Sequence, residues 1–242
     1  MKSYGQYCPI ARTSEFFAER WTPIIIRNLG AGCRTFTQLR EGAPGIPKAI
    51  LTDRLAVLER HGVVDKSPRP TGRGYTYGLT ESGRELKQVC DALGEWGARW
   101  LEIEPRHVDP AYVIWATCRS VDLDAIPRSG LVVRFDLSDA PRQRYWMVLQ
   151  PPRAEVCTSF PGRDEDLVVT TDSTTLMEWN LRWISFQEAL RSGRCRIDGP
   201  PGLARRFPSW VRPSPFANAM RRSGEGDAYG TRPQPRAPTL RA

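Results

Sequence analysis

The chain has 242 residues and a formal net charge of +8, from 35 basic and 27 acidic side chains. This length predicts one or two domains, and the positive excess favours a polyanionic partner with salt-sensitive affinity. No apolar run approaches the roughly 20 residues of a membrane span, and the first residues lack the apolar region of a signal peptide. We therefore expect a cytoplasmic protein without a membrane partner.

Three helical segments are expected before residue 45. Arg12–Arg20 carries two phenylalanines, and Trp21–Leu29 carries three consecutive isoleucines before a glycine stop. A shorter helix is expected over Thr35–Glu41, where Thr35 and Gln38 have the spacing of a capping box.

A fourth helix is expected within Pro44–Val64. Its apolar stripe has helical spacing and consists of Ile50 or Leu51, Leu55 and Leu58. The other face starts with side chains that are small or polar, as a helix that enters a DNA groove requires. These are Lys48, Ala49, Thr52 and Asp53. Taken alone, this stretch favours an ordinary amphipathic surface helix. The elements on both sides reverse that interpretation.

A basic hairpin follows this helix. Val63–Pro68 and Tyr75–Leu79 can pair as strands, and the turn between them is rich in glycine and arginine. Its Arg69 and Arg73, together with Arg54 of the preceding helix, suit contacts with phosphates or the minor groove. The alternative for the arginines is a solvated turn. Three helices and a basic hairpin predict a winged helix-turn-helix that binds double-stranded DNA.

The region Tyr7–Leu101 resembles the HxlR-type transcriptional regulators, relatives of MarR and PadR. The ordered set that carries the resemblance is Cys8-Pro9, Arg20-Trp21-Thr22, Phe36-Thr37-Gln38-Leu39-Arg40, Gly45-Ile46, Leu51-Thr52-Asp53-Arg54-Leu55, Leu58-Glu59, Gly62-Val63-Val64, Tyr77-Gly78-Leu79-Thr80 and Gly83. The resemblance implies a dimeric DNA-binding regulator. This chain departs from the family where Pro47 replaces the usual Ser or Asn cap, and where Ala49 stands near a usually basic position that Lys48 could supply.

The last helix of this region is expected over Thr80–Leu101, with Thr80 as its N-cap. We expect Leu93, Trp96 and Trp100 on its apolar stripe to form a homodimer interface. A two-fold dimer predicts an inverted-repeat operator with half-sites about one helical turn apart. The alternative is that the stripe packs against the rest of the same chain.

The six cysteines include no C-x-x-C pair, and the chain has only two histidines, so we expect no metal site and no cofactor. Cys8 matches the position that resembles the sensing cysteine of some HxlR-type redox regulators. Its alternative role is that of a small apolar residue beside the first helix. The sequence contains neither a G-x-S-x-G nor a phosphate-cradling glycine motif, so we predict no catalytic residues and no enzyme activity.

A domain boundary is expected near Glu104–Pro110. We predict a winged helix domain over 1–104, a second domain over 105–216 and a disordered Pro- and Arg-rich tail over 217–242. In the second domain a helix over Tyr112–Arg119 precedes an antiparallel meander of strands over Leu131–Leu137, Tyr145–Leu149, Glu155–Phe160 and Leu167–Thr171. Further expected elements are a helix that contains Leu176–Leu190, a strand within Gly193–Gly199 and a helix over Pro201–Trp210. The predicted fold class is α+β.

The second domain resembles the sterol-carrier-protein fold over about Asp109–Phe216. The resemblance rests on Asp166-Leu167-Val168-Val169-Thr170-Thr171-Asp172, the tryptophan-bearing helix, Ala189-Leu190-Arg191-Ser192-Gly193 and Ile197-Asp198-Gly199. It implies an apolar cavity between sheet and helices, which Trp146, Trp179, Trp183 and Phe186 would line. A filled core is the alternative. Arg134, Arg144 and Arg182 could pair with an acidic headgroup or could be solvated.

Two functions remain compatible with the sequence. The first is a transcription factor whose second domain senses a hydrophobic small molecule. The second is a lipid or hydrophobic-metabolite carrier whose N-terminal half mediates association. The arginines of the hairpin and the net charge favour the transcription factor.

Overall fold

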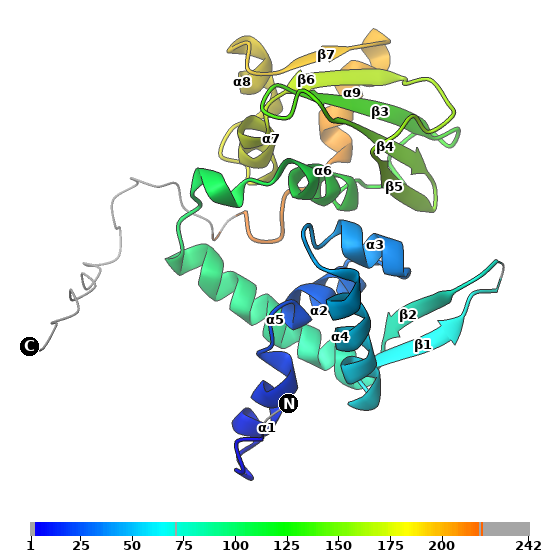
Figure 1. Ribbon diagram of the computed structural model, residues 1–242. Coiled ribbons are helices and arrows are strands. Elements are labelled where there is room, and N and C mark those ends of the chain that lie inside the picture. The colour runs from blue at the N-terminus through cyan, green and yellow to red at the C-terminus, as the bar shows by residue number, and fades with distance from the viewer. Residues whose placement is uncertain (1–2, 71, 218, 220–242) are drawn as a thin grey trace, which may run out of the picture.

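The computed structural model describes residues 3–70, 72–217 and 219. A group of helices with a projecting hairpin forms the N-terminal half, and a sheet with its helices forms the C-terminal half (Figure 1). Apart from residues 217 and 219, the tail that we expected to be disordered lies outside the described residues. No helix in the described part of the chain is both long and apolar enough to cross a membrane.

The N-terminal half runs from α1 to α5. Its elements are α1 (Pro9–Phe17), α2 (Thr22–Gly30), α3 (Phe36–Glu41), α4 (Lys48–Arg60), β1 (Val64–Pro68), β2 (Tyr75–Leu79) and α5 (Glu81–Trp100). The predicted capping box of Thr35 and Gln38 is confirmed, and Thr80 caps α5 by accepting from the Gly83 N–H. Helix α1 starts earlier than the expected Arg12 because Pro9, which suits the first turn of a helix, begins it.

The core of the N-terminal half lies beneath the inner face of α4. Leu51, Leu55 and Leu58 are buried there, so Leu51 rather than Ile50 belongs to the stripe. They pack with Ile25, Ile26, Leu29 and Leu39 of the two preceding helices. At Gly62 the chain turns from α4 into β1 with φ +67°, a conformation that favours glycine. The order of α2, α3, α4 and the hairpin of β1 and β2 is that of a winged helix-turn-helix.

The C-terminal half runs from η1 to α9. Its elements are η1 (Pro105–His107), α6 (Pro110–Arg119), β3 (Leu131–Leu137), β4 (Arg144–Gln150), β5 (Arg153–Cys157), β6 (Leu167–Thr171), α7 (Ser173–Asn180), α8 (Phe186–Arg191), β7 (Arg196–Asp198) and α9 (Pro201–Trp210). The predicted strand spans Leu131–Leu137 and Leu167–Thr171 are confirmed. Together with the N-terminal half, they give a mixed α+β chain.

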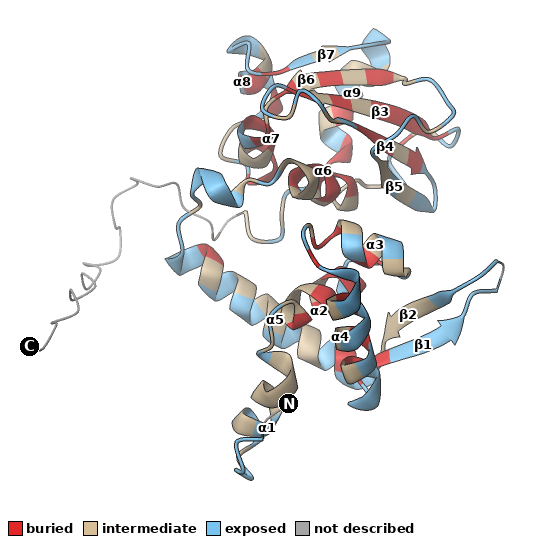
Figure 2. Cartoon of the chain, viewed as in Figure 1, coloured by how far each residue is buried: buried red, intermediate tan, exposed pale blue. Residues whose placement is uncertain are grey.

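The predicted antiparallel meander is wrong, because the five-stranded sheet of the described residues is mixed. Its strand order is β5-β4-β3-β6-β7, and β3 pairs parallel with β6. The segment 158–166 therefore crosses from the edge strand β5 past β4 and β3. Strand β3 becomes the central strand and is buried over most of its length, as its colour in Figure 2 shows. Apolar patterns identify strands but not the order in which they pair.

The prediction of a single helix that contains Leu176–Leu190 is also wrong. This segment is divided into α7 and α8 by a turn in which Arg182 has φ +60°. The second helix has its own capping box, since Ser185 accepts from the Glu188 N–H and the Glu188 side chain accepts from the Ser185 N–H. A new helix start of this kind competes with continuation of the first helix.

One face of the sheet packs on an aromatic interior. Phe207 of α9 is fully buried, and its ring centroid lies 5.8 Å from that of Trp179 and 5.7 Å from that of Phe186. Phe135 of the central strand lies 6.3 Å from Phe207. These rings pack against one another between the sheet and its helices, where the filled-core alternative expects a packed interior.

Candidate nucleic-acid interface

The outer face of α4 carries the side chains that the sequence assigned to the DNA groove. Lys48, Ala49, Thr52 and Asp53 are all exposed, opposite the buried leucines. Pro47 is the N-cap and makes no side-chain cap bond, so the first-turn N–H groups at the positive end of the helix receive no side-chain acceptor from it. Thr52 donates its hydroxyl to the Lys48 carbonyl at 3.0 Å and keeps its acceptor lone pairs for another partner.

Arg54 is held differently from these residues. Its guanidinium donates to the carboxylate of Glu19, in the turn before α2, at 2.8 Å. Its side chain is 20% exposed. A phosphate contact by Arg54 therefore requires this ion pair to open, or requires the guanidinium to donate to Glu19 and to the phosphate at the same time.

The hairpin of β1 and β2 projects away from the helices (Figure 1). Arg69 and Arg73 are exposed at its end, where the Arg69 N–H donates to the Gly74 carbonyl at 3.1 Å. Gly72 and Gly74 have φ +83° and +108°, so this turn needs glycine. The structure adds Lys66, which our sequence reasoning missed. Its ammonium lies 4.2 Å from the Tyr75 ring centroid, a cross-strand cation–π contact that only the strand register reveals.

Helix α5 carries an uncovered apolar stripe. Leu93, Trp96 and Trp100 are 52%, 54% and 52% exposed, and Val89 and Leu101 extend the exposed apolar surface. Leu86 and Cys90, on another face of the helix, pack inward on the N-terminal core. A run of large exposed apolar side chains marks an interaction surface.

The thiols differ in their surroundings. All six cysteines lie among the described residues and are free, and Cys8 is half-buried at the start of α1. Burial raises the pKa of Cys118 to about 12 and the pKa values of Cys90 and Cys195 to about 11. These three thiols stay protonated at neutral pH and are poor nucleophiles.

The described residues contain no group of His, Cys, Asp and Glu that could hold a metal ion.

Three of the four residues predicted to bind a ligand meet at one surface hollow. Trp179, Trp183 and Phe186 line an open cavity of about 510 Å³ where α7 turns into α8, with Pro208 and Ser209 of α9 opposite. Trp146 does not join them. Its neighbours Tyr145 and Met147 on β4 belong to the core face, so alternation places Trp146 on the other face, where it contacts Phe160.

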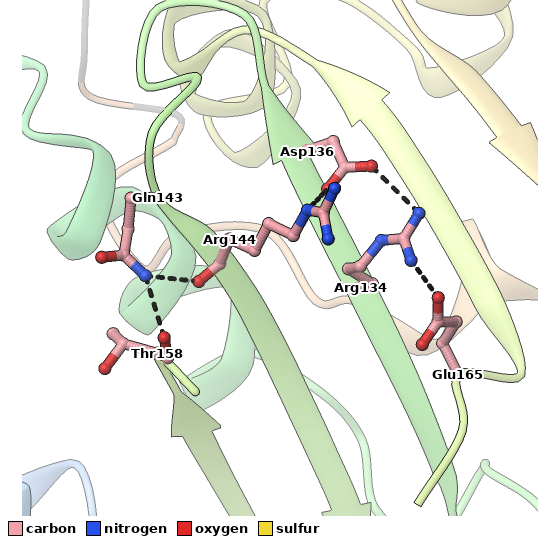
Figure 3. A network of polar contacts seen from close by, with 6 residues as sticks. All are labelled: Arg134, Asp136, Gln143, Arg144, Thr158 and Glu165. Carbon is pink, nitrogen blue, oxygen red and sulfur yellow. Dashed lines mark hydrogen bonds and ion pairs between the residues drawn. The ribbon is translucent and has the colours of Figure 1, made fainter. Parts of the chain in front are cut away.

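The two arginines of the sheet proposed to bind a headgroup already belong to an ion network (Figure 3). Arg134 pairs with Glu165 and, at 3.1 Å, with Asp136. The Nε of Arg144 lies 3.7 Å from the same Asp136. Beside them Gln143 donates to the carbonyls of Arg144 at 2.7 Å and of Thr158 at 3.0 Å, which ties the segment after β5 to the sheet. The third arginine, Arg182, donates to the Val211 carbonyl at 2.8 Å.

Comparison with known proteins gives the same assignment for the N-terminal half. The family model described as HxlR-like helix-turn-helix matches residues 16–105. An uncharacterised HTH-type transcriptional regulator of Synechocystis sp. is 35% identical over 101 residues, which cover 41% of this chain and 75% of the relative. Another from Mycobacterium tuberculosis is 37% identical over 93 residues, which cover 38% of this chain and 58% of the relative.

Among solved structures, the reduced transcriptional regulator YodB of Bacillus subtilis is 28% identical, with a TM-score of 0.35. The match covers 40% of this chain and 97% of that chain. The family model matches a region whose helices and hairpin have the order of a winged helix, and the Synechocystis regulator shares sequence identity with this chain. The chain belongs to the HxlR-like helix-turn-helix family of transcriptional regulators.

Proposed function

We propose that the protein is a dimeric regulator that binds an inverted-repeat operator and responds to a hydrophobic small molecule. The observation that carries this proposal is the exposed polar start of α4 beside a projecting basic hairpin. The proposed division is a DNA-binding and dimerisation domain over 1–104, a sterol-carrier-like domain over 105–216 and a tail over 217–242.

In this proposal α4 enters the major groove, where Lys48, Ala49, Thr52 and Asp53 face the bases. Arg69 and Arg73 of the hairpin contact phosphates or the minor groove, because exposed guanidinium groups suit phosphate oxygens. Arg54 supplies a further backbone contact when its pair with Glu19 opens. Exposure supports the assignment for every one of these side chains except Arg54.

The second copy covers the apolar stripe of α5. Leu93, Trp96 and Trp100 are more than half exposed, and association would remove them from water. Burial of apolar area contributes roughly 25 cal/mol per Å² before the entropic cost of association. A two-fold interface on this helix makes the two α4 helices equivalent, which is what an inverted repeat requires.

The effector site is the hollow between α7, α8 and α9. Trp183 and the largely buried Trp179 and Phe186, which are 1% and 5% exposed, line it on one side. Polar and charged side chains lie at the same site, namely Arg182, Gln187, Glu188 and Ser209. This composition suits a small apolar or aromatic molecule that carries one polar group. Such a ligand regulates DNA binding only if its affinity differs between two conformations.

Selection of DNA fragments by the full-length protein, followed by footprinting at about 0.15 M salt, tests the function. We expect a protected inverted repeat and a sequence-specific affinity far above the non-specific one. Titration with decanoate and with 1-naphthoate, followed by both tryptophan fluorescence and operator affinity, tests the effector site. Retention of DNA without sequence preference would contradict the regulator. Ligand binding that leaves operator affinity unchanged would contradict the switch.

A further inference from the structure

Helix α6 belongs to the cores of both halves. Its Val113, Ile114 and Cys118 are part of the core under the sheet. Tyr112 and Trp115, on the other side of the helix, pack with the core of the N-terminal half, where Trp115 is only 5% exposed. In Figure 1 the helix lies between the sheet and α3, and α3 contacts it. The core beneath the DNA-binding helices is therefore completed by residues that follow α5.

The contact centres on Arg27 of α2. Its guanidinium carbon lies 5.1 Å from the ring centroid of Tyr112 and 5.4 Å from that of Trp115. One guanidinium nitrogen donates to the Tyr112 hydroxyl at 3.2 Å, and another donates to the Gly42 carbonyl, just after α3, at 2.7 Å. Arg27 thus joins α2, the end of α3 and α6 through cation–π contacts and hydrogen bonds.

Close packing around Gly42 makes this contact between α2, the end of α3 and α6 specific. A Cβ at Gly42 would lie 2.6 Å from both the Asn28 amide nitrogen and the Trp115 ring. Asn28 is fully buried, accepts from Arg27 at 2.8 Å and donates to the Leu39 carbonyl at 3.2 Å. Only residues 42–47 separate α3 from α4, so this contact lies close in sequence to the start of α4.

The same helix is tied to the proposed effector site. The Asn180 amide at the end of α7 donates to the Thr117 hydroxyl of α6 at 2.7 Å, and Thr117 is fully buried. Trp179, the residue before Asn180, lines the hollow. Contacts therefore run without interruption from the hollow through α6 to α2 and α3.

We propose that Tyr112 and Trp115 are positioning residues for DNA binding, through which α6 holds Arg27 and sets the placement of the helix-turn-helix. This inference rests on the proposed operator binding for its functional readout. The C-terminal half then controls DNA affinity from within the same protomer, by moving α6. Coupling between such sites typically changes affinity by about 5- to 150-fold.

The test uses the full-length protein and a matched control. Trp115→Leu removes the ring beside Arg27, whereas Trp210→Leu removes an equally buried tryptophan from the core of the C-terminal half. Tyr112→Phe and Arg27→Lys are milder variants that remove the hydroxyl bond and the forked donor set. For each variant we would measure amide hydrogen exchange in α3 and α4 without DNA, and operator affinity as a function of salt.

We expect Trp115→Leu to accelerate exchange in α3 and at the start of α4 and to weaken operator binding about tenfold or more. The salt slope should stay unchanged, because no phosphate contact is lost. Tyr112→Phe and Arg27→Lys should shift both readouts in the same direction by less, and Trp210→Leu should leave exchange in α3 and α4 unaltered.

Equal exchange in the Trp115→Leu, Tyr112→Phe and wild-type proteins would overturn the inference. So would an equal effect of Trp210→Leu on α3, since that would indicate general destabilisation. If the wild-type protein binds no operator, the proposed function fails, and the exchange measurements without DNA still decide whether α6 positions α3 and α4.

Discussion

Arg54 on α4 donates to the carboxylate of Glu19 at 2.8 Å, so the turn before α2 neutralises a cation of the helix proposed to bind DNA. The side chains are 20% and 39% exposed, and partly exposed pairs of this kind contribute little to stability. A phosphate can therefore compete with Glu19 for Arg54. We therefore expect the carboxylate to limit how strongly Arg54 attracts DNA rather than to hold the fold together.

Glu19→Gln should tighten operator binding and steepen its salt dependence by up to about one unit, because Arg54 gains freedom to neutralise a phosphate. Binding measured across a salt series checks both effects. Glu85→Gln on the exposed surface of α5 makes the same change in net charge and serves as the control. Equal slopes for Glu19→Gln and the wild type would show that Arg54 does not reach the backbone of the DNA.

Replacing Arg69 and Arg73 together with Ala should weaken binding to all sequences and flatten the salt slope by about one unit per lost phosphate contact. The matched control is the double variant of Arg128 and Arg142 to Ala, which removes two exposed arginines from the C-terminal half. If both double variants lose the same affinity, the hairpin acts only through net charge and is not a wing in contact with DNA.

Leu93→Asp should convert a dimer into monomers, because it would place an uncompensated charge in the stripe that the second copy covers. Sedimentation velocity checks the oligomeric state, and operator affinity should fall with it. Gln88→Asp adds the same charge at an exposed position of α5 outside the stripe and should leave the dimer intact. Unchanged sedimentation of Leu93→Asp would remove this helix from the interface.

Glu41 should make stability depend on pH in the acidic range. Desolvation raises its pKa above 4.5, and the nearby Arg119 only partly offsets this. The folded protein then keeps the Glu41 proton at pH values where the unfolded chain has lost it. This group's contribution is therefore fully present below about pH 4.5 and is lost as the pH rises through the folded pKa.

Glu41→Gln should accordingly raise the melting temperature near neutral pH and reduce its fall between acidic and neutral pH. Calorimetry of both proteins over that range measures the difference, with Glu85→Gln as an exposed control. A lower melting temperature for Glu41→Gln at neutral pH would mean that attraction of the Glu41 carboxylate to Arg119 outweighs the cost of its desolvation.

Short-range features of the sequence were sufficient for much of the local structure. The Thr35 and Gln38 capping box, the Thr80 cap and the strand Leu131–Leu137 follow from neighbouring residues, and the structure has them as predicted. The capping box of Ser185 and Glu188 was equally legible and was missed, because the apolar repeat on both sides of it resembled one continuous helix. Helix caps and strand alternation are local because their hydrogen bonds join residues a few positions apart.

The sequence by itself determined the elements of the winged helix, its family resemblance and the exposed face of α4 that we propose binds DNA. Only the tertiary structure decided that β6 joins β3 in parallel, that Trp146 faces away from Trp179, and that Trp115 completes the core of the N-terminal half. Each of these depends on contacts between residues far apart in the chain. An apolar side chain indicates that it will be buried but not which residues will bury it, because the hydrophobic effect is non-directional.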